Sequence, residues 1–389
     1  MKILHVTPAF APAFVYGGPV ASVTELCDHL ARSGHDMRVL TTDANGSSVL
    51  ADVSTDREMQ RDSGARVRYC HRRLRSATSP RLLRELRRYV SWADVVHLTA
   101  VYNFPTIPTL VTARLLDRPV VWSPRGALQR WHAVRRRAGK RVWEQVCRVA
   151  ASDRVVLHFT SDEESTESRS RLPHLDSVVV PNGVTVPREL CHVPDAAVSR
   201  LLYLGRLDPI KGVENLLGAC RVLHRTWDSP WVLTVAGGGE PSYVDRLRQL
   251  IVDYGLQARV TLAGSVEGDR REELFSRSDM VVVPSHRESF AMVVAEGLAR
   301  AIPVIASQGT PWKRLEEEGC GLWVQNSPEA LAEAIGRMAR LPLRRMGAAG
   351  HAWMQREFSW AAIADRMVEL YGTLARPRVL SARCQVATT

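Results

Sequence analysis

Two glutamates with seven residues between them, Glu288 and Glu296, are the first candidates for chemistry in this chain. They lie in the segment VVVPSHRESFAMVVAEGLARA at 281–301, where an apolar run typical of a strand ends at Pro284. Glu288 follows in a loop, and the spacing after it predicts a helix that begins near Phe290 and carries Glu296 two turns in. The first carboxylate can accept hydrogen bonds from sugar hydroxyls, and the second can hold a ribose.

The same loop also supplies backbone donors. The amides of Ser289, Phe290 and Ala291 precede the predicted helix, so we expect them to face the cleft that holds Glu288. The alternative for Glu296 is a charge on the helix surface. Its sequence neighbours are of buried type, however, and an unpaired carboxylate among them would be costly.

A pair of cations lies in the segment GRLDPIKG at 205–212, directly after the strand-like run RLLYL. Arg206 and Lys211 stand on either side of a turn that starts a helix. A planar guanidinium, an ammonium and the positive end of a helix dipole together suit a diphosphate. The alternative is a solvated turn with two ordinary surface cations.

The loop after the first predicted strand contains Gly17 and Gly18, followed by a helix. Glycines here let backbone amides approach a ligand, and a helix start favours an anion; a plain turn requirement is the alternative. The loop lacks the G-x-G-x-x-G spacing of dinucleotide-binding proteins. Asp43, at the end of the next strand, therefore does not by itself indicate a nicotinamide enzyme.

Short apolar strands alternate with helices throughout the chain, which predicts parallel sheets covered on both faces. One series of strands and helices runs from Lys2 to about residue 184, and a second begins at Arg200. The fold class is therefore α/β, with two Rossmann-like doubly wound units in tandem, whose post-strand loops would face a common cleft. We predict an amino-terminal unit, a carboxyl-terminal unit, a helix that crosses back and a mobile tail: 1–190, 191–358, 359–375 and 376–389.

Composition narrows the class of protein. With 389 residues, 45% hydrophobic and 24% charged, the chain can bury sizeable cores, which excludes a mainly disordered protein. We expect no membrane span, no signal peptide and, from seven scattered cysteines without a C-x-x-C pair, neither a disulfide framework nor a zinc site. The expected location is the cytoplasm, with peripheral attachment to the inner face of the cell membrane as an addition.

The net charge of +11 is concentrated in one segment. Between Arg66 and Arg148 there are 19 Lys/Arg against 4 Asp/Glu. This imbalance indicates an anionic partner, or a solvated surface in an arginine-rich protein. Within it, the segment at 131–148 has a cationic face and an apolar stripe of Trp131, Val134, Ala138, Val142 and Val146. Such a helix can lie on an anionic bilayer, although packing on the sheet with arginines outward is the slightly preferred interpretation.

Taken together, the paired glutamates after G-R-x-x-x-x-K-G resemble the signature of family 4 of the glycosyltransferases, a large retaining family with the GT-B fold. The resemblance covers nearly the whole chain. SPRGAL and GTPWKRLEEEGCGLWV are also similar to enzymes of polysaccharide assembly. The other matching segments are Gly17-Gly18, SGHDMRVLT at 33–41, VPNGV at 180–184 and FSWAAIA at 358–364.

The resemblance implies a nucleotide-diphosphate sugar, linked to UDP or GDP, as donor substrate. Arg206 and Lys211 would hold the diphosphate and stabilise the leaving group, without a metal or other cofactor. Glu288 and the amides after it would contact the donor sugar, Glu296 the ribose, and the Gly17-Gly18 loop would close over the phosphates. The favoured family mechanism is a front-face reaction in which the leaving phosphate oxygen helps to deprotonate the acceptor hydroxyl.

The sequence departs from the family pattern at the predicted reaction centre. Many members carry His-x-His after the strand equivalent to Val95–Leu98, whereas this chain has His97-Leu98-Thr99. Thr99 is one candidate to bind the sugar, and His97 or His132 are candidates to reach the centre. Ala291 replaces the usual glycine, which adds a methyl group beside the donor. Arg125, in SPRG, either binds the acceptor or forms a structural salt bridge.

The resulting hypothesis is hexose transfer to a glycan or to a saccharide linked to a lipid diphosphate. Two alternatives share the fold: a sugar-nucleotide epimerase and a non-catalytic protein that binds sugar nucleotides. We expect no nucleic-acid partner, because the basic segments lack interleaved aromatic residues. The base and sugar of the donor, the acceptor linkage and the oligomeric state are left open by the sequence.

Overall fold

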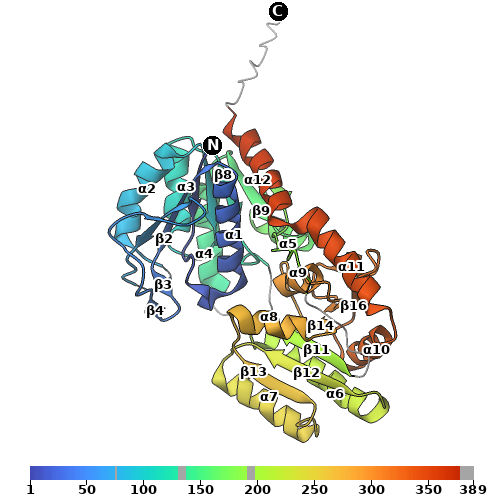
Figure 1. Cartoon of the computed structure of the whole chain (residues 1–389). Helices are drawn as coiled ribbons and strands as arrows, with labels where there is room; N and C mark the ends of the chain where they lie inside the picture. Colours follow the sequence, from blue (N-terminus) through green and yellow to red (C-terminus); the bar gives the residue numbers. More distant parts are fainter. Residues whose placement is uncertain (75–76, 130–136, 191–197, 377–389) are drawn as a thin grey trace, which may run out of the picture.

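The computed structural model describes residues 1–74, 77–129, 137–190 and 198–376. The fold contains an eight-stranded sheet, which is parallel apart from one antiparallel edge strand, and a six-stranded parallel sheet (Figure 1). This arrangement confirms the expected α/β fold with two Rossmann-like units. The predicted boundary at 190/191 adjoins residues outside the described ranges and stays a prediction.

The first sheet has the strand order β10-β9-β8-β7-β1-β2-β6-β5. Only β5, at the edge, runs antiparallel to its neighbour. The strands are β1 (Lys2–Val6), β2 (Asp36–Thr42), β5 (Met59–Gln60), β6 (Arg66–Cys70), β7 (Val95–Thr99), β8 (Val120–Ser123), β9 (Val155–Phe159) and β10 (Asp176–Val179), and a separate hairpin joins β3 (Ala44–Asn45) to β4 (Ser48–Val49).

Helices cover both faces of this sheet because successive strand residues point to opposite sides. The covering helices are α1 (Gly18–Arg32), α2 (Pro80–Trp92), α3 (Thr106–Leu115), α4 (Arg137–Ala150) and α12 (Trp360–Ala375), with α5 (Asp162–Ser168) after β9. Leu4 packs on the face covered by α2, α3 and α4, and Ile3 packs on the face covered by α1 and α12.

The last helix, α12, belongs to the first sheet although it follows the second in the chain. Figure 1 shows it beside α1, and Trp360, Met367 and Tyr371 are buried against that face. A short π-helical segment (Met354–Phe358) leads into it, and Ser359 caps its start by accepting a hydrogen bond from the amide of Ala362.

The second sheet is parallel throughout, with the order β13-β12-β11-β14-β15-β16. Its strands are β11 (Ser199–Leu204), β12 (Trp231–Ala236), β13 (Val260–Gly264), β14 (Met280–Val283), β15 (Val304–Ser307) and β16 (Gly321–Val324). Its helices are α6 (Val213–Thr226), α7 (Pro241–Asp253), α8 (Gly268–Ser276), α9 (Met292–Ala299), α10 (Pro328–Met338) and α11 (Leu343–Trp353).

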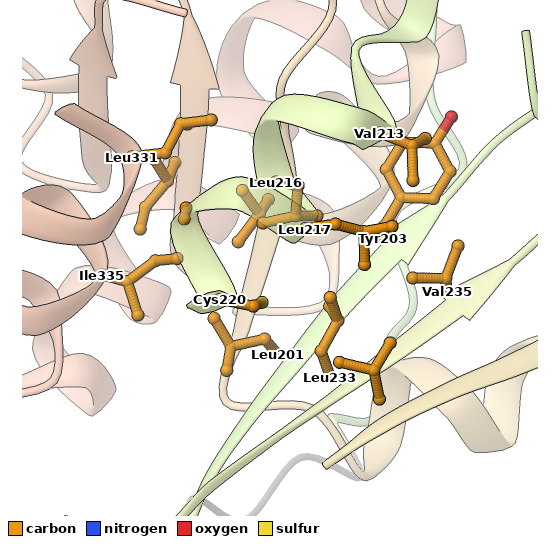
Figure 2. Packing of buried hydrophobic residues seen from close by; sticks show 14 of the residues in the cluster. Leu201, Tyr203, Val213, Leu216, Leu217, Cys220, Leu233, Val235, Leu331 and Ile335 are labelled. Atoms are coloured by element: carbon orange, nitrogen blue, oxygen red, sulfur yellow. The ribbon is translucent and has the colours of Figure 1, made fainter. Parts of the chain in front are cut away.

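The core of the second unit explains why the sequences of its central strands are apolar at successive positions. Leu201 and Tyr203 pack against α6 on one face, while Leu202 between them packs on the opposite face. Figure 2 shows Leu201 and Leu233 from the sheet meeting Leu217 and Cys220 from α6. A strand buried on both sides needs apolar residues at every position.

Candidate functional site

The loop between β14 and α9 meets the first unit at several points. The hydroxyl of Thr160, directly after β9, lies 3.2 Å from the carbonyl oxygen of Ser289. The guanidinium of Arg287 pairs with Glu167 at 2.9 Å. A side chain at Gly126 would lie 3.3 Å from the Cβ of Ser289. The loop that contains Glu288 therefore borders the carboxyl ends of the first sheet, where ligands bind in such folds.

Glu288 and Lys211 form the central ion pair of this loop. Nζ of Lys211 lies 2.5 Å from Oε1 of Glu288, and both side chains are largely buried. The hydroxyl of Ser285 donates to the same carboxylate oxygen at 2.8 Å. The prediction placed Lys211 and Glu288 at one site, and the structure brings them together across 77 residues of sequence.

The turn that carries Arg206 and Lys211 is held by Asp208. Its side chain accepts a hydrogen bond from the amide of Ile210 at 3.1 Å and caps a short helical turn (Pro209–Lys211). Gly212 follows with φ +65°, and a Cβ there would collide with the carbonyl oxygen of Pro284. This close approach, which only glycine permits, brings the end of the turn against the end of β14.

Arg206 is oriented differently from Lys211. Its side chain is 69% exposed, and its ion pair with Asp208 is long, at 3.9 Å. An exposed guanidinium with so weak an internal contact retains its capacity to bind two oxygen atoms of an external anion. The pair predicted to hold a diphosphate thus consists of one cation that is already engaged and one that is exposed.

Glu296 lies in the middle of α9 and is not unpaired. Its Oε2 atom is 2.5 Å from the guanidinium of Arg271 on α8, and both side chains are largely buried. The helix begins at Met292 rather than near Phe290, so Glu296 is only just beyond the first turn. Its assignment as a ribose ligand stays a prediction, with Arg271 as a neighbour that the sequence reasoning missed.

The start of α9 has an unusual backbone. Ala291 adopts φ +63° and ψ +70°, the left-handed region that favours glycine, which explains why a glycine suits this position. The ring of Phe290 points into the core, against Trp312 and Phe358. Phe290 and Ala291 can therefore reach a ligand through their backbone amides, as Ser289 can, but the Phe290 ring cannot.

A cavity of about 880 Å³ lies at the carboxyl ends of the strands of the first sheet. Its lining comes from the loops after β1, β2, β6, β7 and β8. Pro19, next to Gly18, and Arg125, next to Gly126, are both part of this lining. A Cβ at Gly18 would lie 3.7 Å from Met292, and one at Gly126 would lie 3.3 Å from the Cβ of Ser289, so two glycines beside this lining approach the segment that carries Glu288, although the lining itself comes from the first unit. Gly17, with φ +70°, precedes α1 at the same edge.

Arg125 belongs to the cavity and not to a salt bridge. Its guanidinium donates to Oδ1 of Asn182, and within the described ranges no carboxylate lies at ion-pair distance from it. Burial lowers the pKa of this guanidinium, while the nearby Glu164 opposes that shift. Glu164 itself accepts hydrogen bonds from the amides of Gly126 and Thr160. The salt-bridge interpretation of Arg125 is therefore not supported.

His97 does not reach the cavity, and its assignment to the reaction centre is wrong. The side chain is fully buried, and both ring nitrogens are occupied: Nδ1 lies 2.6 Å from the hydroxyl of Tyr371, and Nε2 lies 2.6 Å from that of Ser123. The hydroxyl of Ser123 also contacts Nδ1 of His158, whose Nε2 donates to the carbonyl oxygen of Val180.

These contacts fix every proton in the chain of hydrogen bonds. Because a carbonyl can only accept, Nε2 of His158 carries the hydrogen and its Nδ1 accepts from Ser123. Ser123 in turn accepts from Nε2 of His97, whose Nδ1 accepts from Tyr371. Burial lowers the pKa of His158 to about 3 and that of His97 far below its ordinary value. The histidines are neutral structural links between the sheet and α12.

Thr99, in contrast, lines the cavity. Its hydroxyl lies 2.8 Å from Nε2 of His5, whose pKa burial lowers to about 3. His5 stacks on His97 with ring centroids 4.3 Å apart. The position that holds a histidine in many relatives thus has a threonine supported by a neutral histidine. His132, the other candidate, lies outside the described residues.

The sequence reasoning missed several residues of the site. Ser285 and Arg271 contact the two glutamates, and Glu164 fixes the backbone of the SPRG loop. Arg72 and Arg73 line the cavity after β6, a strand that was not predicted. The excess of arginine in this region was the one available signal for the last two.

Comparisons with known proteins identify both halves of the chain. Residues 16–188 match the family described as Glycosyltransferase Family 4, and residues 197–352 match Glycosyl transferases group 1. A D-inositol 3-phosphate glycosyltransferase from Kineococcus radiotolerans is 27% identical, over 96% of this chain and 95% of that protein. A GDP-mannose:cellobiosyl-diphosphopolyprenol alpha-mannosyltransferase from Xanthomonas oryzae pv. oryzae is 26% identical, over 98% of this chain and the whole of that protein.

Solved structures share the fold. Sucrose-phosphate synthase from Thermosynechococcus elongatus superposes with a TM-score of 0.73 at 21% identity, covering 96% of this chain and 99% of that one. Anabaena Alr3699/HepE in complex with UDP gives 0.72 at 17% identity, covering 96% and 100%. The two family matches and the two parallel sheets identify the chain as a GT-B glycosyltransferase, in which a Glycosyltransferase Family 4 domain precedes a Glycosyl transferases group 1 domain.

Proposed function

We propose that the protein is a retaining, metal-independent glycosyltransferase that moves a hexose from a UDP- or GDP-linked sugar to a hydroxyl of a glycan or lipid-linked saccharide, in polysaccharide or glycoconjugate synthesis. The observation that carries this proposal is the Lys211–Glu288 pair, placed where the two units meet and accompanied by the exposed Arg206. The alternatives of an epimerase or a sugar-nucleotide sensor would not require a separate acceptor cavity such as the one in the first unit.

The proposed binding site for the donor is inferred from the two positive charges of Arg206 and Lys211. A diphosphate that enters beside the turn at 206–211 meets the guanidinium of Arg206 and the ammonium of Lys211, which together neutralise the charge of the departing nucleotide. This pair of cations is the reason that the proposal includes no metal. Glu288 keeps its second carboxylate oxygen for hydroxyls of the sugar, because Lys211 and Ser285 both contact Oε1.

In the proposed reaction, the bond between the anomeric carbon and the phosphate oxygen breaks while a bond to the acceptor oxygen forms on the same face. The proton of the acceptor hydroxyl goes to the departing phosphate oxygen. The neutral, fully bonded His97 is not available as a base. Thr99 instead offers a hydroxyl that orients the sugar or the acceptor in the cavity.

The acceptor side is the cavity of the first unit, and its charge favours an acceptor with a phosphate group. Arg125 is half-buried there without a carboxylate partner in the described part of the chain, and Arg72 and Arg73 line the same space. Two relatives are named for phosphorylated acceptors, an inositol 3-phosphate and a saccharide linked to diphosphopolyprenol. A lipid-linked acceptor would place the enzyme in the cytoplasm at the inner membrane face. No described helix is long and apolar enough to cross a bilayer.

The test is nucleotide release by the purified protein from UDP-, GDP-, ADP- and dTDP-linked sugars, with and without EDTA. Release from one donor that is unchanged by EDTA is the expected result. Inhibition by EDTA would contradict the metal-independent mechanism. Conversion of the donor to an epimer without release of nucleotide would favour the epimerase, and binding without turnover, even with acceptor saccharides present, would favour the sensor.

Replacement of Arg73 by alanine tests the acceptor cavity. Its exposed side chain makes no described contact that supports the fold, so stability should not change. Loss of one charge-assisted hydrogen bond, worth about 1.5–3 kcal/mol, should raise the KM for a phosphorylated acceptor at least about tenfold. Arg345→Ala, on the exposed side of α11, is the matched control. An equal penalty with the dephosphorylated acceptor would contradict phosphate recognition.

A further inference from the structure

An apolar stripe faces solvent on α3. Ile107, Val111 and Leu115 follow one another at intervals of four residues, which places them on one face of the helix. Val111 is 40% exposed and Leu115 is 79% exposed. The core of the unit is built by other residues of the same helix, Leu110 and Ala113. Ile107 packs partly against that core, so only the exposed part of the stripe, Val111 and Leu115, is surplus to the packing of the sheet.

The adjacent helix, α4, has a second stripe of the same kind. Val142, Val146 and Val149 are 65%, 43% and 72% exposed, whereas Cys147 packs into the core. The preferred expectation for this helix, an apolar stripe on the sheet with arginines outward, is thus wrong for Val142 and Val146. The amino-terminal part of the predicted stripe, at 130–136, lies outside the described residues.

The two stripes border one shallow groove. A cavity of about 480 Å³ lies between α3 and α4. Arg114 joins the helices, since its guanidinium donates to the carbonyl oxygen of Val149 at 2.5 Å. We call this surface the α3–α4 face; its members are Ile107, Val111, Arg114, Leu115, Val142, Gln145, Val146 and Val149. An exposed apolar patch of this kind marks a site of interaction.

The charges around the α3–α4 face are positive. Arg114 is exposed within it, and Arg141 is exposed beside Val142. The nearby acids are already neutralised: Glu144 is buried in a pair with Arg171 at 2.9 Å, and Asp117 pairs with Arg154 at 2.9 Å. On the neighbouring α2, Leu83 is exposed among further arginines. The surface thus combines apolar side chains with an unbalanced positive charge.

We propose that the α3–α4 face docks on an anionic lipid bilayer, with its valines and leucine in the acyl boundary and its arginines among the headgroups. Apolar residues that are flanked by cations suit this environment. A second copy of the chain fits less well, because a symmetric contact would bring the same arginines against each other.

Docking of this face would help the enzyme to reach a lipid-linked acceptor, an inference that rests on the proposed function. Asn103 lines the acceptor cavity, and Ile107, four residues later, lines the groove. α3 thus runs from the edge of the cavity into the groove, so a bilayer under α3 and α4 would contact the same unit that holds the acceptor cavity. A saccharide carried on a lipid diphosphate could then enter the cavity while its lipid stays in the membrane.

The test is co-sedimentation of the full-length protein with vesicles of phosphatidylcholine alone, or of phosphatidylcholine with an equal amount of phosphatidylglycerol. The wild type should bind the mixed vesicles, and added salt should weaken the binding. The double substitution Val142→Ser and Val146→Ser should lower the partition coefficient about tenfold, without a change in melting temperature. Arg141→Glu should lower binding to the mixed vesicles alone.

The control is Val252→Ser on α7 of the second unit, a valine that is 53% exposed. It should bind as the wild type does. Failure of the wild type to bind mixed vesicles, or equal binding by the double variant, would overturn the proposal. So would a dimer in light scattering that the double variant abolishes. None of these measurements uses sugar transfer, so failure here is distinguishable from failure of the proposed function.

Discussion

Replacement of Glu288 by alanine is expected to lower kcat for sugar transfer by about 10²–10³ while the protein stays folded. Glu288 is the one group that links the ammonium of Lys211, the hydroxyl of Ser285 and, in the proposed complex, the donor sugar. Its loss removes a negative charge from the site and leaves Lys211 free to move. Loss of a single preorganised group of this type costs about 2.7–4 kcal/mol, or about 10²–10³ in kcat.

Glu288→Gln separates charge from shape. The amide keeps the size of the side chain and one acceptor oxygen, but it cannot form an ion pair with Lys211. We expect kcat to fall nearly as far as in the alanine variant, while the melting temperature stays closer to that of the wild type. Glu273→Gln, on the surface of α8, is the matched control. Normal turnover by Glu288→Gln would show that hydrogen bonding, rather than charge, is what this position supplies.

The fold was predictable where burial alone decides the sequence. β11 and β14 lie between two layers of helices, so Leu201–Leu204 and Met280–Val283 have to be apolar at every position. β6 and α2 escaped prediction because charged residues interrupt their patterns. Arg68, for example, is buried in β6 only because Glu85 on α2 pairs with it at 3.4 Å. Such a contact between distant residues cannot be read from local periodicity.

The candidate site was predictable because its charged residues stand out directly after the apolar strands. Glu288 and Lys211 follow apolar strands, and the carboxyl ends of parallel strands converge. His97 was wrongly predicted to reach the reaction centre because histidine is a common catalytic residue, whereas its position within β7 places it inside the sheet. Only the structure shows that Tyr371, 274 residues away, uses one of its nitrogens. The exposure of the stripe on α4 was equally hidden, because periodicity defines a stripe but does not say which way it faces.

Replacement of Lys211 by alanine should lower kcat/KM for transfer by about 10²–10³, because the ammonium acts mainly on the additional charge that develops as the phosphate leaves. An interaction made mainly in the transition state lowers kcat and kcat/KM together, so the KM for the donor should change little. Lys313→Ala, at an exposed position of the same unit, serves as the matched control.

The ion pair adds a second expectation for Lys211. Without the ammonium, the mostly buried carboxylate of Glu288 keeps only the hydroxyl of Ser285 as a contact on Oε1. An unpaired carboxylate in this setting costs stability, so Lys211→Ala should melt at a lower temperature than the wild type. The double variant Lys211→Met and Glu288→Gln removes both charges and should regain stability without regaining activity. If activity returned together with stability, the pair would have only a structural role and the assignment of Lys211 to the leaving group would fail.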